Sequence, residues 1–340
     1  MANYAESEIM GYAQQIIKNM IGAQTKIKGI EWSGGRFYNE VSRVNTTDGD
    51  FILKIERDKI FFSTRKEQTE NDVYGNELCQ KAGIPCANIL AYDFTKNDIG
   101  VKYVFMERII NDMGDAPLWG RVENFDEVTK VEIKRQFITA FEKQARITSR
   151  HFGSLSPSGI LGRHETYDGY HHSTLNLLIN DSIELGLFTD EELDIVKKAA
   201  AKPLIYSKKY IPTFQTGDQG WHNAMWGNTD GGADKLYMID FGNSIYGLPY
   251  DVEYVCRNYG IDGIYEDDAD IPDVTDADEN LNEVLIASFN GMFHMIWTAA
   301  QQLMVDDTHG DWHARIEAIK KDTSRTHMTD FVNLCRNILK

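Results

Sequence analysis

Residues 216–223 read Thr-Gly-Asp-Gln-Gly-Trp-His-Asn, and residues 240–242 read Asp-Phe-Gly. Two short apolar segments, Ala-Met-Trp-Gly and Lys-Leu-Tyr-Met-Ile, lie between these motifs and flank the turn sequence Asn-Thr-Asp-Gly-Gly. Short apolar segments on either side of a Gly-Gly turn predict a β-hairpin. Asn223 then lies just before the first strand and Asp240 just after the second. The open end of the hairpin is therefore expected to bring these two side chains together.

The residues at this open end have the chemistry of a phosphate-transfer site. An amide oxygen and a carboxylate that face one point form an all-oxygen cation site, which suits Mg²⁺ with phosphate oxygens completing its shell. Asp218 lies five residues before Asn223, on the loop that leads into the hairpin. A carboxylate there could accept the proton of a hydroxyl group aligned with the terminal phosphate of a nucleotide. Metal, nucleophile and base are the main requirements of phosphoryl transfer, so Asp218 is the expected base and Asn223 and Asp240 the expected metal ligands.

This stretch resembles the signature of the aminoglycoside phosphotransferase and choline kinase family, which is His-Gly-Asp-x-x-x-x-Asn, a hairpin, and Ile-Asp-Phe/Trp-Gly. The segment 247–252, Gly-Leu-Pro-Tyr-Asp-Val, is similar to a further motif of the family, although Asp251 also fits the N-cap of a following helix. Thr216 stands where the family has a histidine that supports the loop through hydrogen bonds. A threonine hydroxyl could make part of those bonds, and no catalytic group is lost.

The resemblance implies an α+β, two-lobed fold like that of protein kinases. Residues 1–108 would form a nucleotide-binding lobe of mostly antiparallel sheet plus one helix. Residues 109–340 would form a mainly helical lobe that carries the catalytic loop, the metal site and the acceptor site. Protein kinase activity itself is disfavoured, because Gly220 stands where those enzymes carry a lysine and no Ala-Pro-Glu segment follows residue 242.

The nucleotide lobe of such an enzyme needs a lysine on a strand, paired with a carboxylate on a helix. Lys54 lies in the alternating segment 51–55, which predicts a strand. The segment 65–82 predicts a helix that ends at Gly83. Glu70 of this helix is the expected partner of Lys54, and Glu67 is the alternative.

By the same resemblance, six further residues would contact the nucleotide, which is ATP or GTP. Glycines in a phosphate-covering loop let backbone amides approach the phosphates. A residue behind the purine and two backbone groups at its edge complete the site. The loop residues are Ser33, Gly34 and Gly35, and the hinge residues are Met106, Glu107 and Ile109.

Hydrophobic periodicity predicts elements on both sides of the central motif. Strands are expected at 29–32, 40–44, 51–55 and 103–106. One apolar helical stripe is expected after residue 124, at Val131, Ile138, Phe141 and Ala145. Further helices are expected at 189–201, 284–304, 312–322 and 330–339.

The composition, with 42% hydrophobic and 26% charged residues, is that of a globular protein, and 340 residues suit one large or two packed domains. The four cysteines are scattered without a Cys-x-x-Cys pair, and the N-terminal residues lack the pattern of a signal peptide. Polar residues interrupt the apolar stretch 284–304, which therefore predicts a buried helix and not a membrane span. A cytoplasmic protein is expected.

The formal net charge of −17 is unevenly distributed, because residues 262–279 hold nine acidic residues and no Lys or Arg. A negative charge of this size argues against nucleic acid and anionic membranes as partners. Two interpretations of the acidic stretch stay open. It is either a solvated loop or a lining that attracts a cationic acceptor.

The acceptor is the least determined part of the prediction, because the family phosphorylates aminoglycosides, choline and other small alcohols. An aminoglycoside-like or other cationic small molecule is slightly favoured. The alternatives are a housekeeping kinase for choline, an amino alcohol or a sugar, and a catalytically silent nucleotide-binding protein.

The expected acceptor surface includes residues 159–178 and exposed aromatic side chains, which suit a quaternary ammonium group through cation–π contact. The histidine pair at 171 and 172 is expected to be an ordinary surface feature. His222 is either a loop residue or a contact to substrate or phosphate. The aromatic residues singled out are Trp119, Tyr167, Tyr170 and Trp221.

Overall fold

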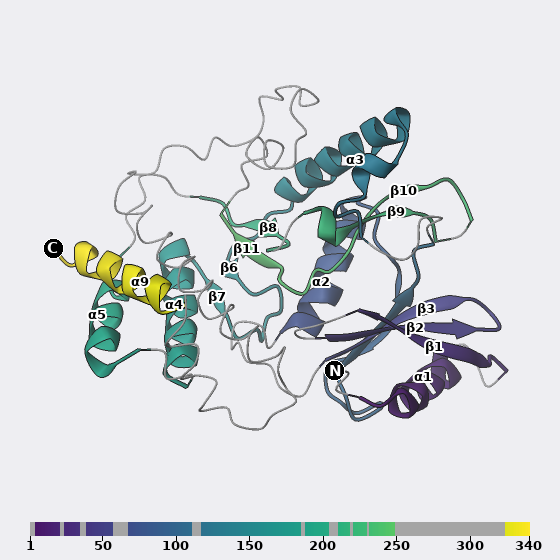
Figure 1. The fold of residues 1–340 in the computed structure, drawn as a ribbon, viewed down its shortest axis with the longest axis horizontal. Helices are drawn as coiled ribbons and strands as arrows, with labels where there is room; N and C mark the ends of the chain where they lie inside the picture. Colours follow the sequence, from purple (N-terminus) through teal and green to yellow (C-terminus); the bar gives the residue numbers. More distant parts are fainter. Residues whose placement is uncertain are drawn as a thin grey trace.

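The computed structural model describes residues 4–20, 24–34, 39–56, 67–110, 117–184, 188–203, 210–217, 220–229, 231–248 and 324–340 (Figure 1). Several predictions fall outside the described residues. These are the ones on Gly35, Asp218, Asp251, the acidic stretch 262–279, and the helices 284–304 and 312–322. The side chains of residues 32–34 are likewise not described.

A five-stranded antiparallel sheet forms the N-terminal part, in the order β1-β2-β3-β5-β4 (Figure 1). The four predicted strands all lie within observed ones and are confirmed. The fifth strand, β4, was not predicted. The bounds are β1 (Ile27–Gly34), β2 (Asn39–Thr46), β3 (Asp50–Glu56), β4 (Ile89–Asp93) and β5 (Tyr103–Glu107).

The two faces of this sheet are covered by different helices. Helix α1 (Glu6–Met20) packs its buried residues Ile16 and Ile17 against Leu53 and Phe105 on one face. Because side chains alternate along a strand, Lys54 points to the opposite face, toward α2 (Gln68–Lys81). The expectation of one helix in this part is therefore wrong, since α1 is a second one.

Helix α2 confirms the predicted helix over 65–82 as far as it is described. Ala82 is its C-cap residue, and Gly83 has φ 73, a left-handed conformation that favours glycine after a helix. Strand β3 lies in the middle of the sheet, with β2 and β5 as its neighbours. Lys54 is thus not a lysine on a sheet edge.

The second part of the chain is built around α3 (Glu127–Ala145), a helix that begins at the N-cap Asp126. It packs against the hairpin of β9 (Ala224–Gly227) and β10 (Lys235–Met238). The predicted apolar stripe is only partly right, because Val131 is 56% exposed while Ile138 and Phe141 are buried. The helix turns a neighbouring face inward, which consists of Ile133, Phe137, Ile138, Ala140, Phe141 and Gln144.

The remaining elements lie beyond the hairpin, and α4, α5 and α9 stand together at the end of the molecule far from the N-terminal sheet (Figure 1). A small antiparallel sheet has the order β7-β6-β11-β8. The predicted helix 189–201 corresponds to α5, which Thr189 caps with a capping box, and the predicted helix 330–339 belongs to α9. The bounds are β6 (Phe152–Gly153), β7 (Arg163–His164), α4 (Tyr167–Glu184), α5 (Asp190–Ala200), β8 (Thr213–Gln215), β11 (Ile245–Gly247) and α9 (Ser324–Ile338).

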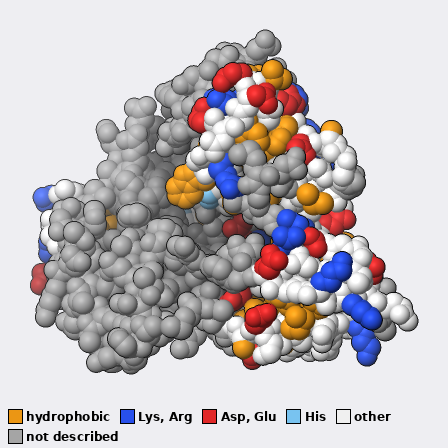
Figure 2. Space-filling view, turned by 45° about the vertical axis from the view of Figure 1, so that its right-hand side comes forward, with side chains coloured by type: hydrophobic (Ala, Val, Ile, Leu, Met, Phe, Trp, Pro, Cys, Tyr) orange, Lys and Arg blue, Asp and Glu red, His pale blue; other side chains and the backbone are white. Residues whose placement is uncertain are grey.

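On the surface of the described N-terminal part, acidic and basic side chains are interspersed with small hydrophobic groups (Figure 2). No helix within the described ranges is both long and apolar enough to span a membrane.

The described residues on either side of the junction between the two parts of the chain, Ile110 and Leu118, bond to the β9–β10 hairpin. Ile110 and Asn228 exchange backbone hydrogen bonds of 2.6 and 2.9 Å. Further along, the Leu118 N–H donates to the Ala224 carbonyl oxygen over 2.9 Å. A Cβ atom built at Gly227 would overlap with the Ile110 carbonyl oxygen, so the backbones approach this closely only because residue 227 is glycine.

We expect Gly227→Ala to lower the free energy of unfolding by about 2 kcal/mol or more, because the new methyl group must push two hydrogen-bonded backbones apart. Urea denaturation followed by circular dichroism measures the change. Gly11→Ala is the matched control, since nothing lies within 4 Å of a Cβ atom at this position in α1. It should be neutral or slightly stabilising, and an equal loss in both variants would contradict the close approach at Gly227.

Candidate active site

The open end of the β9–β10 hairpin places Asn223 and Asp240 next to each other. The Ile239 N–H donates to the Asn223 carbonyl oxygen over 3.0 Å, one residue before Asp240. Asn223 is 7% exposed and ends the short 3-10 helix η3 (Trp221–Asn223), whereas the Asp240 side chain is 51% exposed. The predicted hairpin is confirmed, and it places a buried asparagine and an accessible carboxylate at neighbouring backbone positions.

Lys54 connects this hairpin end to the N-terminal sheet. Its Nζ atom lies 2.7 Å from Asp72 Oδ2 and 3.3 Å from Asp240 Oδ1. Burial by itself lowers the pKa of Lys54, but the charges of Asp240 and Asp72 outweigh this effect and raise the pKa above its ordinary value. Lys54 is therefore a cation at neutral pH, held between a carboxylate of α2 and the carboxylate at the end of the hairpin.

Asp72 uses its second oxygen to hold the Asp-Phe-Gly segment. Its Oδ1 atom accepts the Phe241 N–H over 2.7 Å. Burial raises the pKa of Asp72, and the charge and hydrogen bond of Lys54 oppose that rise. We assign the ionised form at neutral pH, because both carboxylate oxygens accept hydrogen bonds and one donor is a cation.

The rest of the α2 surface that faces this segment consists of polar and small residues. Gln68 Nε2 donates to Asn243 Oδ1 over 2.7 Å, and Asn71 Nδ2 donates to the Gly242 carbonyl oxygen over 3.4 Å. At Gly75 a Cβ atom would lie 2.7 Å from the Cβ atom of Phe241, so the glycine admits the phenylalanine ring. These contacts fix the residues that follow Asp240, whose own φ of 61 lies in the left-handed region that non-glycine residues rarely adopt.

The prediction that Glu70 or Glu67 pairs with Lys54 is wrong. Glu70 Oε1 lies 3.7 Å from Lys102 Nζ, and Glu67 Oε2 accepts a hydrogen bond from Ser154 Oγ over 2.9 Å. Residues two positions apart on a helix point in different directions, so Glu70 and Asp72 cannot serve the same site. The spacing of Gln68, Asn71, Asp72 and Gly75, all on one helical face, is the signal that would have identified the correct face.

The predicted hinge residues lie between the sheet and the hairpin. Met106 and Ile109 pack in one hydrophobic cluster with Met225 and Tyr237. The Glu107 N–H donates to the Asn88 carbonyl oxygen over 2.9 Å and is therefore committed to the protein. In the part of the chain that the structure describes, the Ile109 N–H has no such partner, which leaves it available to a ligand.

Of the predicted phosphate-covering loop, the structure describes only the first residues. Gly34 is the last residue of β1 and pairs with Val41, while Ser33 precedes it in the same strand. Val41 in turn pairs with Lys54. The loop after β1 therefore begins two strands away from Lys54, and the roles of Ser33, Gly34 and Gly35 stay predictions.

The loop that carries Asp218 begins against the Asp-Phe-Gly segment. Gly217 has φ 73, and a Cβ atom at this position would overlap with the Asn243 carbonyl oxygen. Thr216, which replaces the family histidine, is buried, and its hydroxyl has no hydrogen-bond partner among the described residues. The backbone contact at Gly217 thus places the start of this loop beside the hairpin end.

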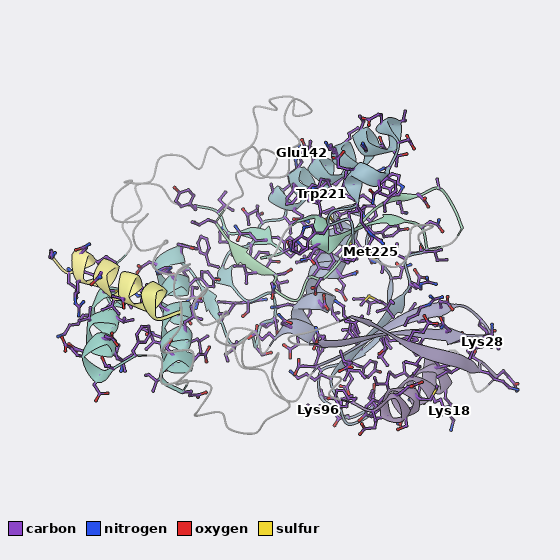
Figure 3. All side chains as sticks on the ribbon, viewed as in Figure 1. Lys18, Lys28, Lys96, Glu142, Trp221 and Met225 are labelled. Carbon is purple, nitrogen blue, oxygen red and sulfur yellow. The ribbon has the colours of Figure 1, made fainter. Side chains whose placement is uncertain are left out.

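Two of the predicted acceptor residues are structural. Trp221 stacks on Phe137 of α3, with ring centroids 4.0 Å apart, and Figure 3 shows it beside that helix. Tyr170 of α4 is buried with Phe152 and Leu161. Trp119, in contrast, is strongly exposed, and its ring contacts that of His222.

The prediction that the histidine pair is a surface feature holds for only one residue. His172 is partly exposed, and its Nε2 atom lies 3.2 Å from Asp168 Oδ1. His171 is 2% exposed, because it lies one turn before Leu175 on the inner face of α4. Burial and the neighbouring His172 lower the pKa of His171 to about 4, and Asp168 only partly opposes this.

The described residues contain no group of three or more His, Cys, Asp or Glu side chains suited to bind a metal ion. The donor set at the hairpin end is one amide and one carboxylate, which differs from a closed protein metal site. It fits a hard cation such as Mg²⁺, which keeps open positions for phosphate oxygens and water.

Comparison with known proteins identifies the fold. No family model and no curated protein sequence matches the chain. The structure is similar to that of the "putative fructosamine-3-kinase" of Haemophilus somnus 129PT, with a TM-score of 0.54 and 12% sequence identity over 96% of this chain and 97% of the other.

Two further solved structures are similar over most of their length. The aminoglycoside phosphotransferase APH(4)-Ia, in its complex with AMP-PNP and hygromycin B, gives a TM-score of 0.47 at 12% identity over 94% of this chain and 98% of that one. The GDP and kanamycin complex of APH(2")-IIia gives 0.48 at 13% identity, with 97% and 98% covered. The match to the Haemophilus protein confirms the α+β, kinase-like fold.

We expect Asp72→Asn to lower the free energy of unfolding by about 3 kcal/mol, because the amide would turn a donor toward the buried Lys54 ammonium group. Glu70→Gln removes a charge two residues away and should cost less than about 1 kcal/mol. Urea denaturation of the two variants provides the comparison. Equal losses would show that Lys54 does not depend on Asp72.

The buried His171 makes a prediction about pH. Its pKa is about 4 in the folded protein and 6.5 as a reference value, so the unfolded chain binds more protons between these limits. Lowering the pH from 8 to 5 should therefore cost about 2 kcal/mol of stability through this residue. In His171→Gln, the decrease in the free energy of unfolding between pH 8 and pH 5 should be smaller by about 2 kcal/mol than in the wild type. Urea denaturation of both proteins at both pH values measures the difference. Parallel pH profiles in the two proteins would contradict the low pKa.

Proposed function

We propose that this chain is a magnesium-dependent small-molecule kinase that transfers the γ-phosphate of ATP or GTP to a hydroxyl group. The observation that carries the proposal is the meeting of three segments at the hairpin end. Lys54 of the sheet contacts Asp72 of α2 and Asp240 of the hairpin, and the backbone of Asn223 pairs with the residue before Asp240. A cation, an accessible carboxylate and an amide then face the place where phosphates would lie.

Each described residue has a distinct task in this proposal. Lys54 holds the nucleotide phosphates through its positive charge, and Asp72 keeps it protonated and oriented. Asp240 and Asn223 hold Mg²⁺, which when bound neutralises charge on the phosphate oxygens. Asp240 suits this task because its second oxygen, Oδ2, has no hydrogen-bond partner within the described ranges.

Asp218 is the proposed catalytic base and lies outside the described residues. Support for its place comes from Gly217, whose backbone approaches the Asn243 carbonyl oxygen closely. Gly217 directly precedes Asp218 in the sequence and lies beside the residues that follow Asp240. A carboxylate at this point accepts the proton of the attacking hydroxyl group as the oxygen approaches the γ-phosphorus.

For the nucleotide base, the proposed contacts are the hinge residues that pack against the hairpin. Met106 stands behind the purine, with the Glu107 carbonyl and the Ile109 N–H at its edge. The cluster of Met106, Ile109 and Met225 supplies an apolar environment there. The free Ile109 N–H supports this assignment. These contacts involve backbone groups and do not distinguish ATP from GTP.

The proposed acceptor is a cationic, hydroxyl-bearing small molecule of the aminoglycoside type. Support comes from the formal net charge of −17 and from the acidic stretch 262–279. A catalytically silent protein is disfavoured, because the lysine, its carboxylate partner and both metal ligands are all present.

We expect Asp218→Asn to lower the rate of nucleotide-dependent phosphorylation by about 10² to 10⁴-fold, the usual contribution of a general base, while nucleotide binding persists.

In Asp240→Ala, magnesium-dependent binding of a nucleotide should be lost, as measured by calorimetry with and without Mg²⁺. Glu77→Gln, an exposed carboxylate of α2, is the charge-matched control. Full activity in Asp218→Asn would remove the assigned base, and unchanged binding in Asp240→Ala would remove the metal site.

A further inference from the structure

Trp119 is the most exposed tryptophan in the described part of the chain, with 76% of its surface accessible. Exposing a large aromatic side chain to this degree forgoes most of the free energy that its burial would supply. Its two tryptophan neighbours in the fold, Trp221 and Trp226, are packed in the core that α3 shares with the hairpin. The position of Trp119 therefore calls for an explanation other than packing.

The backbone holds Trp119 on a fixed turn. The Arg121 N–H donates to the Leu118 carbonyl oxygen over 2.9 Å, and Gly120 has φ 68, which matches the third residue of a type II turn. Leu118 and Val122, on either side, are buried in the core below. Trp119 is thus presented at the tip of a turn that is anchored at both ends, so little side-chain or loop entropy would be lost when a ligand binds.

The ring of Trp119 lies against the ring of His222, with centroids 5.7 Å apart and planes tilted by 58°. His222 belongs to η3 and directly precedes Asn223, the proposed metal ligand. The two aromatic rings therefore adjoin the proposed catalytic centre. They come from segments that are distant in sequence and are joined by the hydrogen bond from Leu118 to Ala224.

The register along β9 separates the turn of Trp119 from the hinge residue Ile110. Ile110 pairs with Asn228 at the hinge end of the strand, and Leu118 bonds to Ala224 at the catalytic end. Four residues of strand correspond to about 13 Å. The turn that carries Trp119 therefore lies at the end of β9 where phosphate transfer would take place.

We propose that Trp119 and His222 form the acceptor subsite and that they bind the face of a saturated, hydroxyl-bearing ring with amino substituents, such as an amino sugar. This proposal rests on the proposed kinase function and adds to it the residues that select the acceptor. Two aromatic planes tilted by 58° form an open corner, which can cover one face and one edge of a ring. An ammonium group on that ring gains cation–π attraction from the indole.

A compact acyclic cation makes less use of this geometry. Quaternary ammonium groups are recognised by aromatic cages that surround them on several sides. The described residues provide a corner of two rings at this point. A cyclic amino alcohol fills the corner with one face and still directs a ring hydroxyl toward Asn223, which follows His222 in η3.

The test uses the full chain with two cationic, hydroxyl-bearing probes, kanamycin for the ring and choline for the acyclic cation. Trp119→Ala should raise the KM for kanamycin about tenfold, which corresponds to the free energy of one good aromatic or cation–π contact. The KM for the nucleotide should stay unchanged. Trp119→Phe should restore most of the affinity, and Tyr92→Ala, which removes an exposed aromatic from β4, is the matched control.

A second readout is the tryptophan fluorescence of the protein. Kanamycin should quench it in the wild type and much less in Trp119→Phe, whereas choline should have a weak effect in both. An unchanged KM in Trp119→Ala, an equal effect on nucleotide and kanamycin, or a wild-type protein that binds neither probe would each overturn the proposal.

Failure of the kinase function itself has a different signature. In that case the wild type would show no magnesium-dependent nucleotide binding, and Asp240→Ala would not differ from it. If nucleotide binding and phosphate transfer are present and Trp119→Ala behaves like the wild type, only the acceptor subsite is wrong.

Discussion

The ion pair between Lys54 and Asp72 joins the elements on which the candidate site depends. Asp72 is almost fully buried and contacts the lysine of β3 with one oxygen and the backbone of Phe241 with the other. One carboxylate thus connects the N-terminal sheet, helix α2 and the segment after the hairpin. Because a buried charge is costly unless it is paired and hydrogen-bonded, each of the three elements fixes the other two.

A second constraint is the close contact of backbones around the hairpin. Ile110 and Leu118 form backbone hydrogen bonds with Asn228 and Ala224, and Gly227 allows the close approach of Ile110 because it lacks a Cβ atom. Gly217 and Gly75 allow the same at Asn243 and Phe241. The segments of the candidate site are therefore held by main-chain contacts with little freedom, which is the preorganisation that the proposed phosphoryl transfer requires. Trp119 gains its fixed position from the same frame, through the hydrogen bond between Leu118 and Ala224.

Features that depend only on residues close in the sequence were predicted correctly, and features that depend on tertiary contacts were not. The hairpin, the four strands and the helix α5 were predicted correctly, because turn residues, strand alternation and helix-start residues act within a few positions along the chain. The partner of Lys54 was predicted wrongly, because the choice between Glu70 and Asp72 depends on the rotation of α2 against the sheet. The exposure of Val131 and the burial of His171 depend in the same way on which helical face meets the core.

The sequence by itself determined the kinase-like fold of this protein and the hairpin at its candidate site. The order Gly-Asp, Asn and Asp-Phe-Gly around a hairpin, together with a lysine on an alternating strand, selects the kinase-like fold and the residues proposed for the site. Only the tertiary structure decided which carboxylate accompanies Lys54, which of two tryptophans faces solvent, and which histidine is buried. The physical reason is that spacing along the chain encodes turns and strand alternation, whereas the rotation of a helix is set by contacts with residues that are distant in the sequence.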